Sequence, residues 1–417
     1  MILKDKIPGY NTLVLPYHFL QSALARNIAG RPDKKLHIIG VTGTNGKTTT
    51  SFMIWKMLNT AGFKTGLMTT VAWGISDESH LKKQIEHMTT VDPKTLNSRI
   101  KAIKDSGVEY LVLEVTSHAL AQFRTLGIHF DIAVMTNVTH EHLDYHKTFD
   151  NYIAAKCKLF RQASFGVINA DDPSAKAFET AISPNKYITY GIKSGQAQAE
   201  NIKLATSGVE YTVDGINIKT KIPGEFNVYN SLAAVCVGKR LGLKDEQIKK
   251  GLHALEEVEG RMNRINEGQK FDVIVDFAHT PDAFEKVFTS VKKPKGRIIS
   301  LFGGAGRRDE TTRAERGEIA GKFSDICILT EDDSRDESPE KIIAMFEEGC
   351  KKSGLKDSQI IKITDRKEAI EHAIKIAKPG DLVLILGKGH EKTILRADGP
   401  HPFEDLKVVR EAIRKSH

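Results

Sequence analysis

One stretch decides the fold of this 417-residue chain, namely Leu36-His37-Ile38-Ile39-Gly40-Val41-Thr42-Gly43-Thr44-Asn45-Gly46-Lys47-Thr48-Thr49-Thr50. Its apolar first part predicts a buried strand, and the glycines that follow predict a turn into a helix from about residue 48 to residue 59. Glycines at 43 and 46 let successive backbone N–H groups point at phosphate oxygens, while Lys47 adds a positive charge and Thr48 a hydroxyl for Mg²⁺. We therefore predict a nucleotide phosphate loop made of Gly43, Thr44, Asn45, Gly46, Lys47, Thr48 and Thr49.

The loop departs from the strict pattern GxxxxGK[ST] at its first position. That pattern requires glycine at 41, where this chain has Val41, and Gly40 lies one place too early. The simpler alternative is a glycine turn between a strand and a helix that carries a lysine by chance. Strand, turn and helix follow in the order that the motif requires, which favours the phosphate loop.

Composition indicates a soluble protein of more than one domain. The length exceeds that of an ordinary single core, and 40% hydrophobic with 27% charged residues is typical of globular chains. The net charge of +8 suits an enzyme that collects nucleotides, but the basic residues are scattered, so nucleic acid is not expected as a ligand. The four cysteines lack CxxC spacing, and no run of 18 apolar residues occurs. We expect reduced thiols, no membrane insertion and a cytoplasmic location.

Strands and helices alternate in two successive series. We expect a short N-terminal segment over 1–35 with one helix over 17–29, a central domain over 36–258 and a C-terminal domain over 259–417. The expected strands are 64–70, 109–115, 131–136 and 166–169 in the first series, and 271–276, 297–302, 326–330, 360–363 and 382–386 in the second. The expected helices of the central series are 93–106, 149–162, 228–241 and 244–255. This alternation predicts α/β folds with mostly parallel sheets, the second one doubly wound and Rossmann-like. Residues 197–222, around the Asp214-Gly215 turn, predict a small antiparallel patch.

A carboxylate follows the strand at 111–113. Glu114 stands at the sheet edge where a phosphate-loop domain places a second Mg²⁺ ligand. An acidic residue at a strand end is more often a solvated loop charge, and the preceding phosphate loop favours the ligand. Ser117, His118, Gln122 and Arg124 follow in a polar turn, where Ser117 and His118 could instead only cap a helix.

A second polar cluster covers residues 136–146, with histidines at 140, 142 and 146 and carboxylates at 141 and 144. Zinc is one interpretation. Mg²⁺ with the bound nucleotide fits better, because no thiolate is near and a phosphate site is already indicated. An ordinary polar loop is the alternative, and we expect only one of the histidines to be a ligand.

Several motifs in order resemble the Mur ligases, which are ATP-dependent amide-bond enzymes of peptidoglycan synthesis, and most closely the MurE type that adds the third residue of the stem peptide. GTNGKTT at 43–49 resembles the family's ATP loop. Residues 114–120, EVTSHAL, resemble its EVSSHxL motif with Thr116 in place of the first serine. Residues 136–146 resemble TNxxxDHLDxH, with Glu141 in place of the aspartate.

The resemblance implies roles around the nucleotide. Lys47 and Thr48 would hold ATP phosphates and Mg²⁺, Glu114 would share that ion, and His142 would bind a second one. Lys156 matches the lysine that the family carries as a carbamate, which turns a cation into an anion with oxygen ligands. The sequence alone predicts a solvated helix lysine there. Further positions near the nucleotide are Asn227, Asn230, His279 and Arg308.

The resemblance also implies two substrate sites. Thr89, Thr90, Ser117, Gln122 and Arg124 match positions that hold the sugar-peptide acceptor. Residues 330–335 and 387–391 take the places of the DNPR and GKGHE motifs, which in relatives that use meso-diaminopimelate bind its distal carboxylate and ammonium. The matching positions are Asp332, Asp333, Arg335, Gly387 and Glu391. Arg335 could instead only pair with acidic neighbours, and the extra charge of Asp333 keeps lysine and ornithine as alternatives.

Together these features predict a ligase that uses ATP and Mg²⁺ to add meso-diaminopimelate to UDP-MurNAc-L-Ala-D-Glu through an acyl phosphate, as a monomer acting on small molecules. The family normally carries a uridine-binding domain of about a hundred residues before the ATP strand, and here about 35 residues precede it. We therefore expect weak anchoring of the uridine end, or a partner that supplies that site. The alternatives are a two-domain relative such as folylpolyglutamate synthetase, and a Mur-like ATP-binding subunit of an amidotransferase complex.

Overall fold

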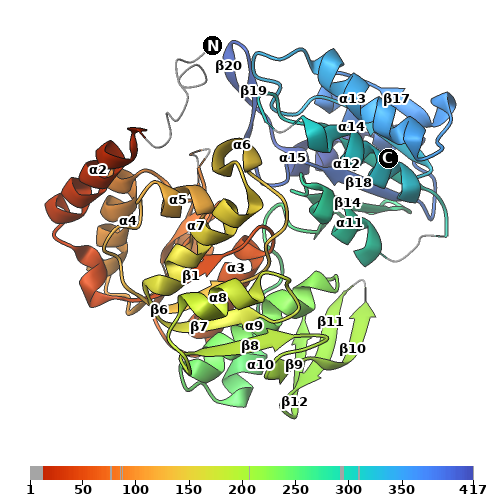
Figure 1. The fold of residues 1–417 in the computed structure, drawn as a ribbon. Coiled ribbons are helices and arrows are strands. Elements are labelled where there is room, and N and C mark those ends of the chain that lie inside the picture. Colours follow the sequence, from red (N-terminus) through yellow and green to blue (C-terminus); the bar gives the residue numbers. More distant parts are fainter. Residues whose placement is uncertain are drawn as a thin grey trace. The chain divides into compact units, whose positions relative to one another are not determined.

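The chain forms two compact units in a computed structural model that describes residues 13–75, 78–84, 86, 88–205, 207–291, 295–308 and 310–416. Unit 1 comprises Met1–Leu204, Val209–Lys221 and Glu225–Glu256, and unit 2 comprises Ala205–Gly208, Ile222–Gly224 and Glu257–His417. Each unit combines a mostly parallel sheet with helices, which confirms the predicted α/β class (Figure 1). No helix in the described part of the chain has the length and apolarity needed to cross a membrane.

Unit 1 contains a large sheet with strand order β4-β3-β2-β5-β1-β6-β7-β8-β9. The bounds are β1 (His37–Thr42), β2 (Thr65–Met68), β3 (Ala72–Ile75), β4 (Leu81–Lys83), β5 (Tyr110–Glu114), β6 (Phe130–Met135), β7 (Ala163–Asn169), β8 (Tyr187–Gly191) and β9 (Ala197–Gln198). In this spatial order, every pair of neighbouring strands between β2 and β9 is parallel, and β1 lies between β5 and β6. This places the phosphate-loop strand in the middle of the sheet.

Helices cover both faces of this sheet (Figure 1). They are α2 (Leu15–Ile28), α3 (Lys47–Thr60), α4 (Pro93–Asp105), α5 (Ser117–Ala121), α6 (Leu143–His146), α7 (Phe149–Arg161), α8 (Ala175–Ala181), α9 (Phe226–Arg240) and α10 (Asp245–His253), with short 3₁₀ turns η2 (Pro32–Lys35) and η3 (Glu78–His80). Helices α4, α5, α7 and α8 share one apolar core with alternate strand residues such as Ile38 and Leu111. Helices α3, α9 and α10 pack together, and α3 and α9 contact sheet strands. Successive strand residues such as Ile38 and Ile39 are therefore both fully buried.

Two short segments of unit 1 differ from the sequence-based expectation. Strands β3 and β4 extend the sheet edge as antiparallel strands and were not expected, because their residues include Lys82 and Lys83 and lack a continuous apolar run. The patch at 197–222 forms a three-stranded sheet of β10 (Glu200–Ala205), β11 (Gly208–Val213) and β12 (Ile216–Thr220), in which β11 and β12 are antiparallel, as predicted. Its first residues, however, form β9, which pairs in parallel with β8 and belongs to the large sheet.

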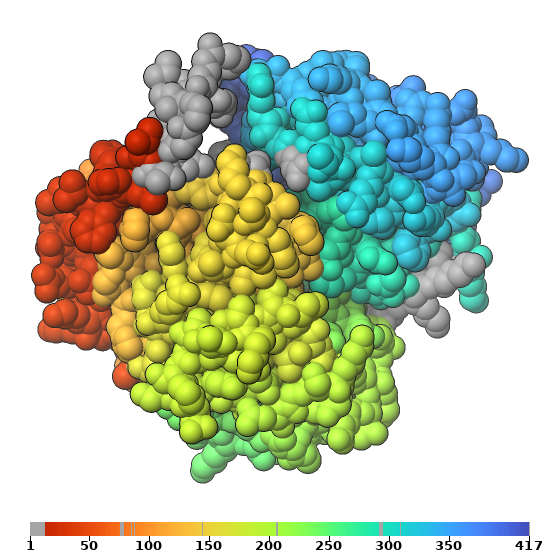
Figure 2. Space-filling view, viewed as in Figure 1, coloured from red at the N-terminus to blue at the C-terminus, as the bar shows by residue number. Residues whose placement is uncertain are grey.

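Helix α2 carries apolar side chains on its solvent side. Tyr17, Leu20, Leu24 and Ile28 are each at least 60% exposed, at the spacing of one helix face. The opposite side packs on α4 and fully buries only Ser22. In the space-filling view the red residues of α2 lie on the surface (Figure 2). Burial of apolar side chains therefore contributes little to holding α2 on unit 1.

Unit 2 has a six-stranded sheet in the order β13-β14-β18-β15-β16-β17, parallel except at β13. Its strands are β13 (Asn263–Arg264), β14 (Asp272–Asp276), β15 (Ile298–Phe302), β16 (Ile326–Leu329), β17 (Ile360–Lys362) and β18 (Leu382–Leu386), with a separate hairpin β19 (Thr393–Arg396) and β20 (Gly399–Pro402). Its helices are α11 (Pro281–Ser290), α12 (Thr311–Phe323), α13 (Pro339–Lys352), α14 (Arg366–Ile376) and α15 (Asp405–Ser416), with the 3₁₀ turn η4 (Asp357–Gln359). Helices α14 and α15 pack on one face of the core, and α11, α12 and α13 pack as a second group. This is the doubly wound arrangement that the sequence predicts.

Candidate active site

The phosphate loop lies where β1 ends and α3 begins, at the carboxyl edge of the sheet. Gly43 has φ +152°, and a Cβ atom there would lie 1.9 Å from Thr136 Oγ1. Gly46 has φ +83°, and its Cβ would lie 2.4 Å from Asn230 Oδ1. A side chain at either position would displace its neighbour, so both glycines are needed for this loop. The first N–H groups of α3 face the loop and favour an anion there.

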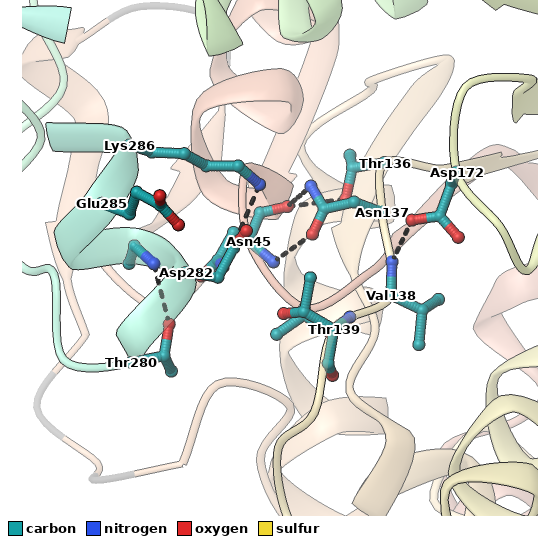
Figure 3. Close-up of polar contacts among 12 residues, drawn as sticks. Asn45, Thr136, Asn137, Val138, Thr139, Asp172, Thr280, Asp282, Glu285 and Lys286 are labelled. Atoms are coloured by element: carbon teal, nitrogen blue, oxygen red, sulfur yellow. Dashed lines mark hydrogen bonds and ion pairs between the residues drawn. The ribbon is translucent and has the colours of Figure 1, made fainter. Parts of the chain in front are cut away.

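Residues 136–139 hold the loop in place (Figure 3). Asn45 N donates to Asn137 Oδ1 at 3.0 Å, and Asn137 Nδ2 donates back to Asn45 O at 3.0 Å. Thr136 Oγ1 also donates to Asn45 O at 2.7 Å, and Thr44 N donates to Asn137 O at 2.7 Å. The segment after β6 therefore fixes the phosphate loop before any ligand binds.

Two lysines donate to carbonyl groups of this loop. Lys47 Nζ lies 2.7 Å from Thr44 O, and Lys156 Nζ lies 2.6 Å from Gly43 O. The prediction of a solvated Lys156 is wrong, because α7 turns this residue inward and it is 1% exposed, with Nζ 4.4 Å from the Tyr152 ring centre. Burial, and then the charge of Lys47, lower the pKa of Lys156 well below its ordinary value. This amine is therefore far less basic than a surface lysine.

Glu114 ends β5 beside the phosphate loop and is 1% exposed. Its Oε2 accepts from Thr48 Oγ1 at 3.0 Å and from Thr70 N at 3.1 Å. Its Oε1 accepts from Thr70 Oγ1 at 3.1 Å. The structure thus brings together Thr48 and Glu114, the two residues predicted to share Mg²⁺.

The side chains around the loop fit a divalent cation with phosphate. Thr48 and Glu114 offer oxygen ligands, which Mg²⁺ prefers. The hydroxyls of Thr42 and Thr139 are buried at the loop without a hydrogen-bond partner within the described ranges. Because a buried hydroxyl rarely stays unpaired, these groups favour a polar ligand in the loop.

The histidines of residues 136–146 separate into different environments. The ring of His140 stacks on Phe149 with centres 4.4 Å apart, and His146 Nε2 lies 3.0 Å from Ser117 Oγ. His142 has φ +57°, and its Nε2 lies 3.5 Å from Glu141 Oε1. Within the described part of the chain these side chains do not form a metal-ligand group with converging atoms. This arrangement gives no support to the zinc interpretation.

Four of the predicted acceptor residues, Thr89, Thr90, Gln122 and Arg124, lie in one connected patch next to Glu114. Thr90 Oγ1 donates to the Glu114 carbonyl at 3.0 Å, and the hydroxyl oxygens of Thr70 and Thr89 lie 2.9 Å apart. Arg124 donates to the Thr90 carbonyl and, at 2.7 Å, to Gln122 Oε1. These residues are linked by hydrogen bonds to Glu114, so an acceptor bound there would lie beside the phosphate loop.

The residues predicted to approach the nucleotide fall in both units. Asn230 Oδ1 accepts from Thr50 Oγ1 at 3.2 Å, and Asn230 Nδ2 donates to Asn227 Oδ1 at 2.8 Å, on the first turn of α9. His279 and Arg308 belong to unit 2 and are exposed. The two asparagines are therefore part of the loop's surroundings, and the roles of His279 and Arg308 stay predictions.

A cluster of charges in unit 2 brings together the residues predicted for the amino acid. Asp332 and Asp333 lie beyond β16, and Glu391 lies in the loop that follows β18. The Nζ of Lys388 lies 2.6 Å from Asp333 Oδ1 and 2.5 Å from Glu391 Oε2. Gly387 has φ +116°, and a Cβ there would lie 2.8 Å from Asp332 Oδ2. Glycine at 387 therefore lets the two loops approach.

Arg335 stands beside this cluster with a strained backbone. Its φ is +54°, its N–H donates to Leu395 O at 2.8 Å, and its Nη1 donates to Gly306 O at 2.7 Å. No carboxylate among the described residues forms an ion pair with Arg335, so the expectation that it only neutralises its acidic neighbours loses support. Those neighbours have other partners: Asp336–Arg307 (2.7 Å), Glu337–Arg313 (2.6 Å) and Asp333–Lys388 (2.6 Å).

Sequence reasoning missed three polar residues of these sites. Thr70 links Glu114 to the acceptor patch, and Lys388 lies among the carboxylates of unit 2. Asn137 forms hydrogen bonds with the backbone of the phosphate loop. Thr70 and Asn137 follow strand ends at the carboxyl edge of the sheet, and that position is the signal that could have identified them. For Lys388, the only signal in the sequence was its place in the GKGHE segment.

A phosphate loop beside an acidic strand end, in a chain whose second unit carries its own cluster of charges, indicates a nucleotide-dependent enzyme. Residues 41–238 match the Mur ligase middle domain, and residues 260–389 match the Mur ligase glutamate ligase domain. The chain belongs to the Mur ligase family and is an ATP-dependent amide-bond ligase of peptidoglycan precursor synthesis.

Two similar ligases support this assignment to the Mur ligase family. The chain is 39% identical over 403 residues to UDP-N-acetylmuramoyl-L-alanyl-D-glutamate--2,6-diaminopimelate ligase 1 of Clostridium acetobutylicum, covering 94% of this chain and 81% of the relative. It is 41% identical over 401 residues to the corresponding ligase of Clostridium tetani, covering 94% and 80%. These proteins are of the MurE type that the sequence motifs indicated, which confirms the resemblance.

Solved structures share the fold. A structure of a UDP-N-acetylmuramoyl-L-alanyl-D-glutamate--2,6-diaminopimelate ligase is 30% identical with a TM-score of 0.64, covering 96% of this chain and 82% of that one. Folylpolyglutamate synthase of Mycobacterium tuberculosis, solved with ADP and AMPPCP, has a TM-score of 0.72 at 16% identity, covering 95% and 94%. At that identity the second likeness is one of fold alone.

Proposed function

We propose that the chain adds meso-diaminopimelate to UDP-MurNAc-L-Ala-D-Glu, with residues 36–258 as the ATP-binding domain and 259–417 as the amino-acid-binding domain. The observation that carries the proposal is in unit 2: Arg335 forms no ion pair among the described residues, and it lies within electrostatic range of the Glu391 carboxylate. Such a pocket suits a side chain that ends in both a carboxylate and an ammonium. The relatives named above as 2,6-diaminopimelate ligases support the same amino acid.

The proposed reaction has two steps at these sites. The acceptor carboxylate attacks the γ-phosphorus of ATP, and ADP leaves, which gives an acyl phosphate. The amine of the amino acid then attacks the acyl carbon, phosphate leaves with the C–O electron pair, and the nitrogen loses a proton. Lys47 at the phosphate loop would stabilise the charge that builds on the transferred phosphoryl group.

Mg²⁺ is part of this proposal. Thr48 and Glu114 would hold one ion and His142 a second, and Mg²⁺ would supply positive charge to the phosphate oxygens. The buried free cysteines support a reducing, cytoplasmic setting. We infer that the enzyme acts as a monomer on small molecules.

The overall function is tested by incubating the purified chain with ATP, Mg²⁺, the UDP-linked dipeptide and diaminopimelate. We expect phosphate release together with a product whose mass is that of the tripeptide. Phosphate release without an amide product would instead favour an ATP-binding subunit that works with a separate amidotransferase.

Carbamylation of Lys156 is the first prediction from the site. A buried amine whose pKa is lowered loses its proton more readily than a surface lysine, and the neutral amine attacks CO₂, forming an N–C bond and releasing one proton. The resulting anion would bring oxygen ligands to the phosphate loop. With ¹³C-labelled bicarbonate, we expect a carbamate signal in the ¹³C NMR spectrum of the protein.

The control for this prediction is a second lysine on the same helix. Lys158 is half-buried and lies over the Phe123 ring. We expect Lys158→Met to keep the carbamate signal and Lys156→Met to lose it together with ligase activity. A signal that persists in Lys156→Met would place the carbamate elsewhere, and full activity of that variant would remove Lys156 from the mechanism.

The acceptor site gives a second prediction. We propose that unit 1 holds the acceptor through its sugar and peptide, by Thr90, Ser117 and Arg124, which lie in the patch beside Glu114 or next to it. Contacts of this kind give little discrimination against an acceptor that lacks the uridine group. We expect kcat/KM for acceptors with and without UDP to differ by less than about tenfold. A much larger preference for the UDP form would mean that contacts outside this patch bind the uridine group.

A further inference from the structure

Lys388 is a buried ammonium of unit 2 with several acidic neighbours. Its side chain is 0% exposed, and its Nζ lies 2.6 Å from Asp333 Oδ1, 2.5 Å from Glu391 Oε2 and 3.4 Å from Asp332 Oδ1. Burial alone would lower the pKa of Lys388, but the carboxylates of Asp332, Glu391 and Asp333 raise it above the ordinary value. The residue is therefore charged throughout the range in which the enzyme works.

The position of this ammonium decides what the acidic cluster can bind. Oxygen atoms of Asp332, Asp333 and Glu391 lie within 4.8 Å of one another, as they would around a metal ion. The Nζ of Lys388 already contacts all three side chains. A second full positive charge at the same centre would be repelled, so the arrangement disfavours a metal ion there.

The cluster still carries an excess of negative charge. Three carboxylates face one ammonium, and Asp333 Oδ1 is further tied to Leu395 N at 2.9 Å. The side chain of Glu391 is 25% exposed, whereas those of Asp332 and Asp333 are 10% and 8% exposed. Glu391 is therefore the carboxylate that a ligand's ammonium can reach from solvent.

We propose that Lys388 is a positioning residue of the amino-acid pocket, whose buried ammonium holds the Glu391 carboxylate in place and ionised so that it receives the distal ammonium of the added amino acid. The inference rests on the proposed function, because it takes residues 332–335 and 387–391 as the amino-acid site. Arg335 would meet the distal carboxylate of the same ligand.

The protonation of Glu391 makes the proposal measurable. Burial raises the pKa of Glu391, Lys388 lowers it, and Asp332 and Asp333 raise it, which together leave this pKa at about 7. Below about pH 7 the side chain gains a proton and no longer attracts an ammonium. Other charged groups that interact with it are Arg335 and Arg366, and Arg366 is tied to Asp405 at 2.8 Å. The KM for diaminopimelate should therefore rise as the pH falls through this value, while the KM for ATP should not.

Two substitutions should move this pH dependence in opposite directions. Lys388→Met removes the counter-charge of Glu391, so the midpoint of the KM profile should shift up by about one pH unit or more. Asp333→Asn removes a negative neighbour but keeps an oxygen for Lys388 and Leu395, so the midpoint should shift down. A merely structural role would weaken binding in both variants without opposite shifts.

The measurement is KM for diaminopimelate and ATP between about pH 6 and pH 9 for wild type and both variants, with 2-aminopimelate as a substrate that lacks the distal ammonium. Of these two amino acids, only diaminopimelate should show a midpoint in the dependence of its KM on pH. Profiles that stay unchanged, or that shift in the same direction, overturn the proposal. If loss of the buried cation prevents Lys388→Met from folding, the downward shift in Asp333→Asn decides alone.

Lysine, which has the distal ammonium but no distal carboxylate, separates this inference from the proposed function. If wild type uses lysine but not diaminopimelate, and the lysine profile shifts as described, the amino-acid assignment fails and the role of Lys388 stands. If wild type uses diaminopimelate but neither variant moves the midpoint, the role of Lys388 fails and the assignment stands. If no amino acid with a distal ammonium is joined to the acceptor, both fail.

Discussion

Replacing Lys47 with alanine is expected to lower ATP-dependent phosphate release by about 10³-fold while leaving the fold intact. The side chain is half-buried, and its Nζ donates to Thr44 O at 2.7 Å. Its removal leaves no buried charge unpaired, so the melting temperature should change little. The loss should appear mainly in kcat, because the charge acts on the phosphoryl group as transfer proceeds.

Lys94→Ala is the matched control for this experiment. Lys94 is an exposed lysine near the start of another unit 1 helix, α4, and alanine is well tolerated there. We expect wild-type phosphate release from Lys94→Ala. If Lys47→Ala retains full turnover, the phosphate loop has no part in the chemistry; if both variants lose activity equally, the loss is not specific to the loop.

Buried parallel strands were the part of the fold that the sequence predicted best. Strands such as β5, β15 and β18 are continuous apolar runs with both faces covered, and their expected limits lie within about two residues of the observed ones. The edge strands β3 and β4 and the hairpin of β19 and β20 were missed. They are three or four residues long and contain exposed positions, so their pairing depends on neighbours that periodicity does not reveal.

The candidate site was predictable where a local motif carries its own geometry. Gly43, Gly46, Lys47 and Thr48 are adjacent in sequence, and a strand and a helix fix where they lie. Lys156 was misjudged because its burial follows from the packing of α7 against the loop, which is 113 residues away in sequence. A lysine within an otherwise apolar helix face was the available signal.

The pairing of charges that are far apart in the sequence could not be predicted from the sequence. Lys388 and Asp333 are 55 residues apart and meet only because β16 and β18 end at the same edge of the unit 2 sheet. The sequence indicated that Asp333 adds negative charge to the pocket, which kept lysine as an alternative substrate. The structure places a buried ammonium against that carboxylate, which weakens the argument for lysine.

Arg335→Ala is expected to lower kcat/KM for diaminopimelate by about 10² to 10³-fold, because the distal carboxylate would lose a charged, fork-shaped partner. The KM for ATP should stay unchanged, and wild type should use lysine much more poorly than diaminopimelate, since a guanidinium without a carboxylate repels an ammonium. Amide formation with the two amino acids, measured in parallel, gives both quantities. Arg335→Lys should recover only part of the activity, because an ammonium lacks the two parallel donors.

The control for Arg335 is Arg414→Ala, which makes the same change at a solvent-exposed ion pair of unit 2. Arg414 is 64% exposed and lies 2.8 Å from Glu267, a surface contact that contributes little to stability. We expect wild-type kinetics from this variant. The diaminopimelate assignment fails if lysine proves the better substrate of wild type, or if Arg335→Ala uses diaminopimelate as well as Arg414→Ala does. Because Arg335 has no ion-pair partner among the described residues, its loss should leave no unpaired carboxylate, and a drop in kcat/KM would report on the ligand rather than on the fold.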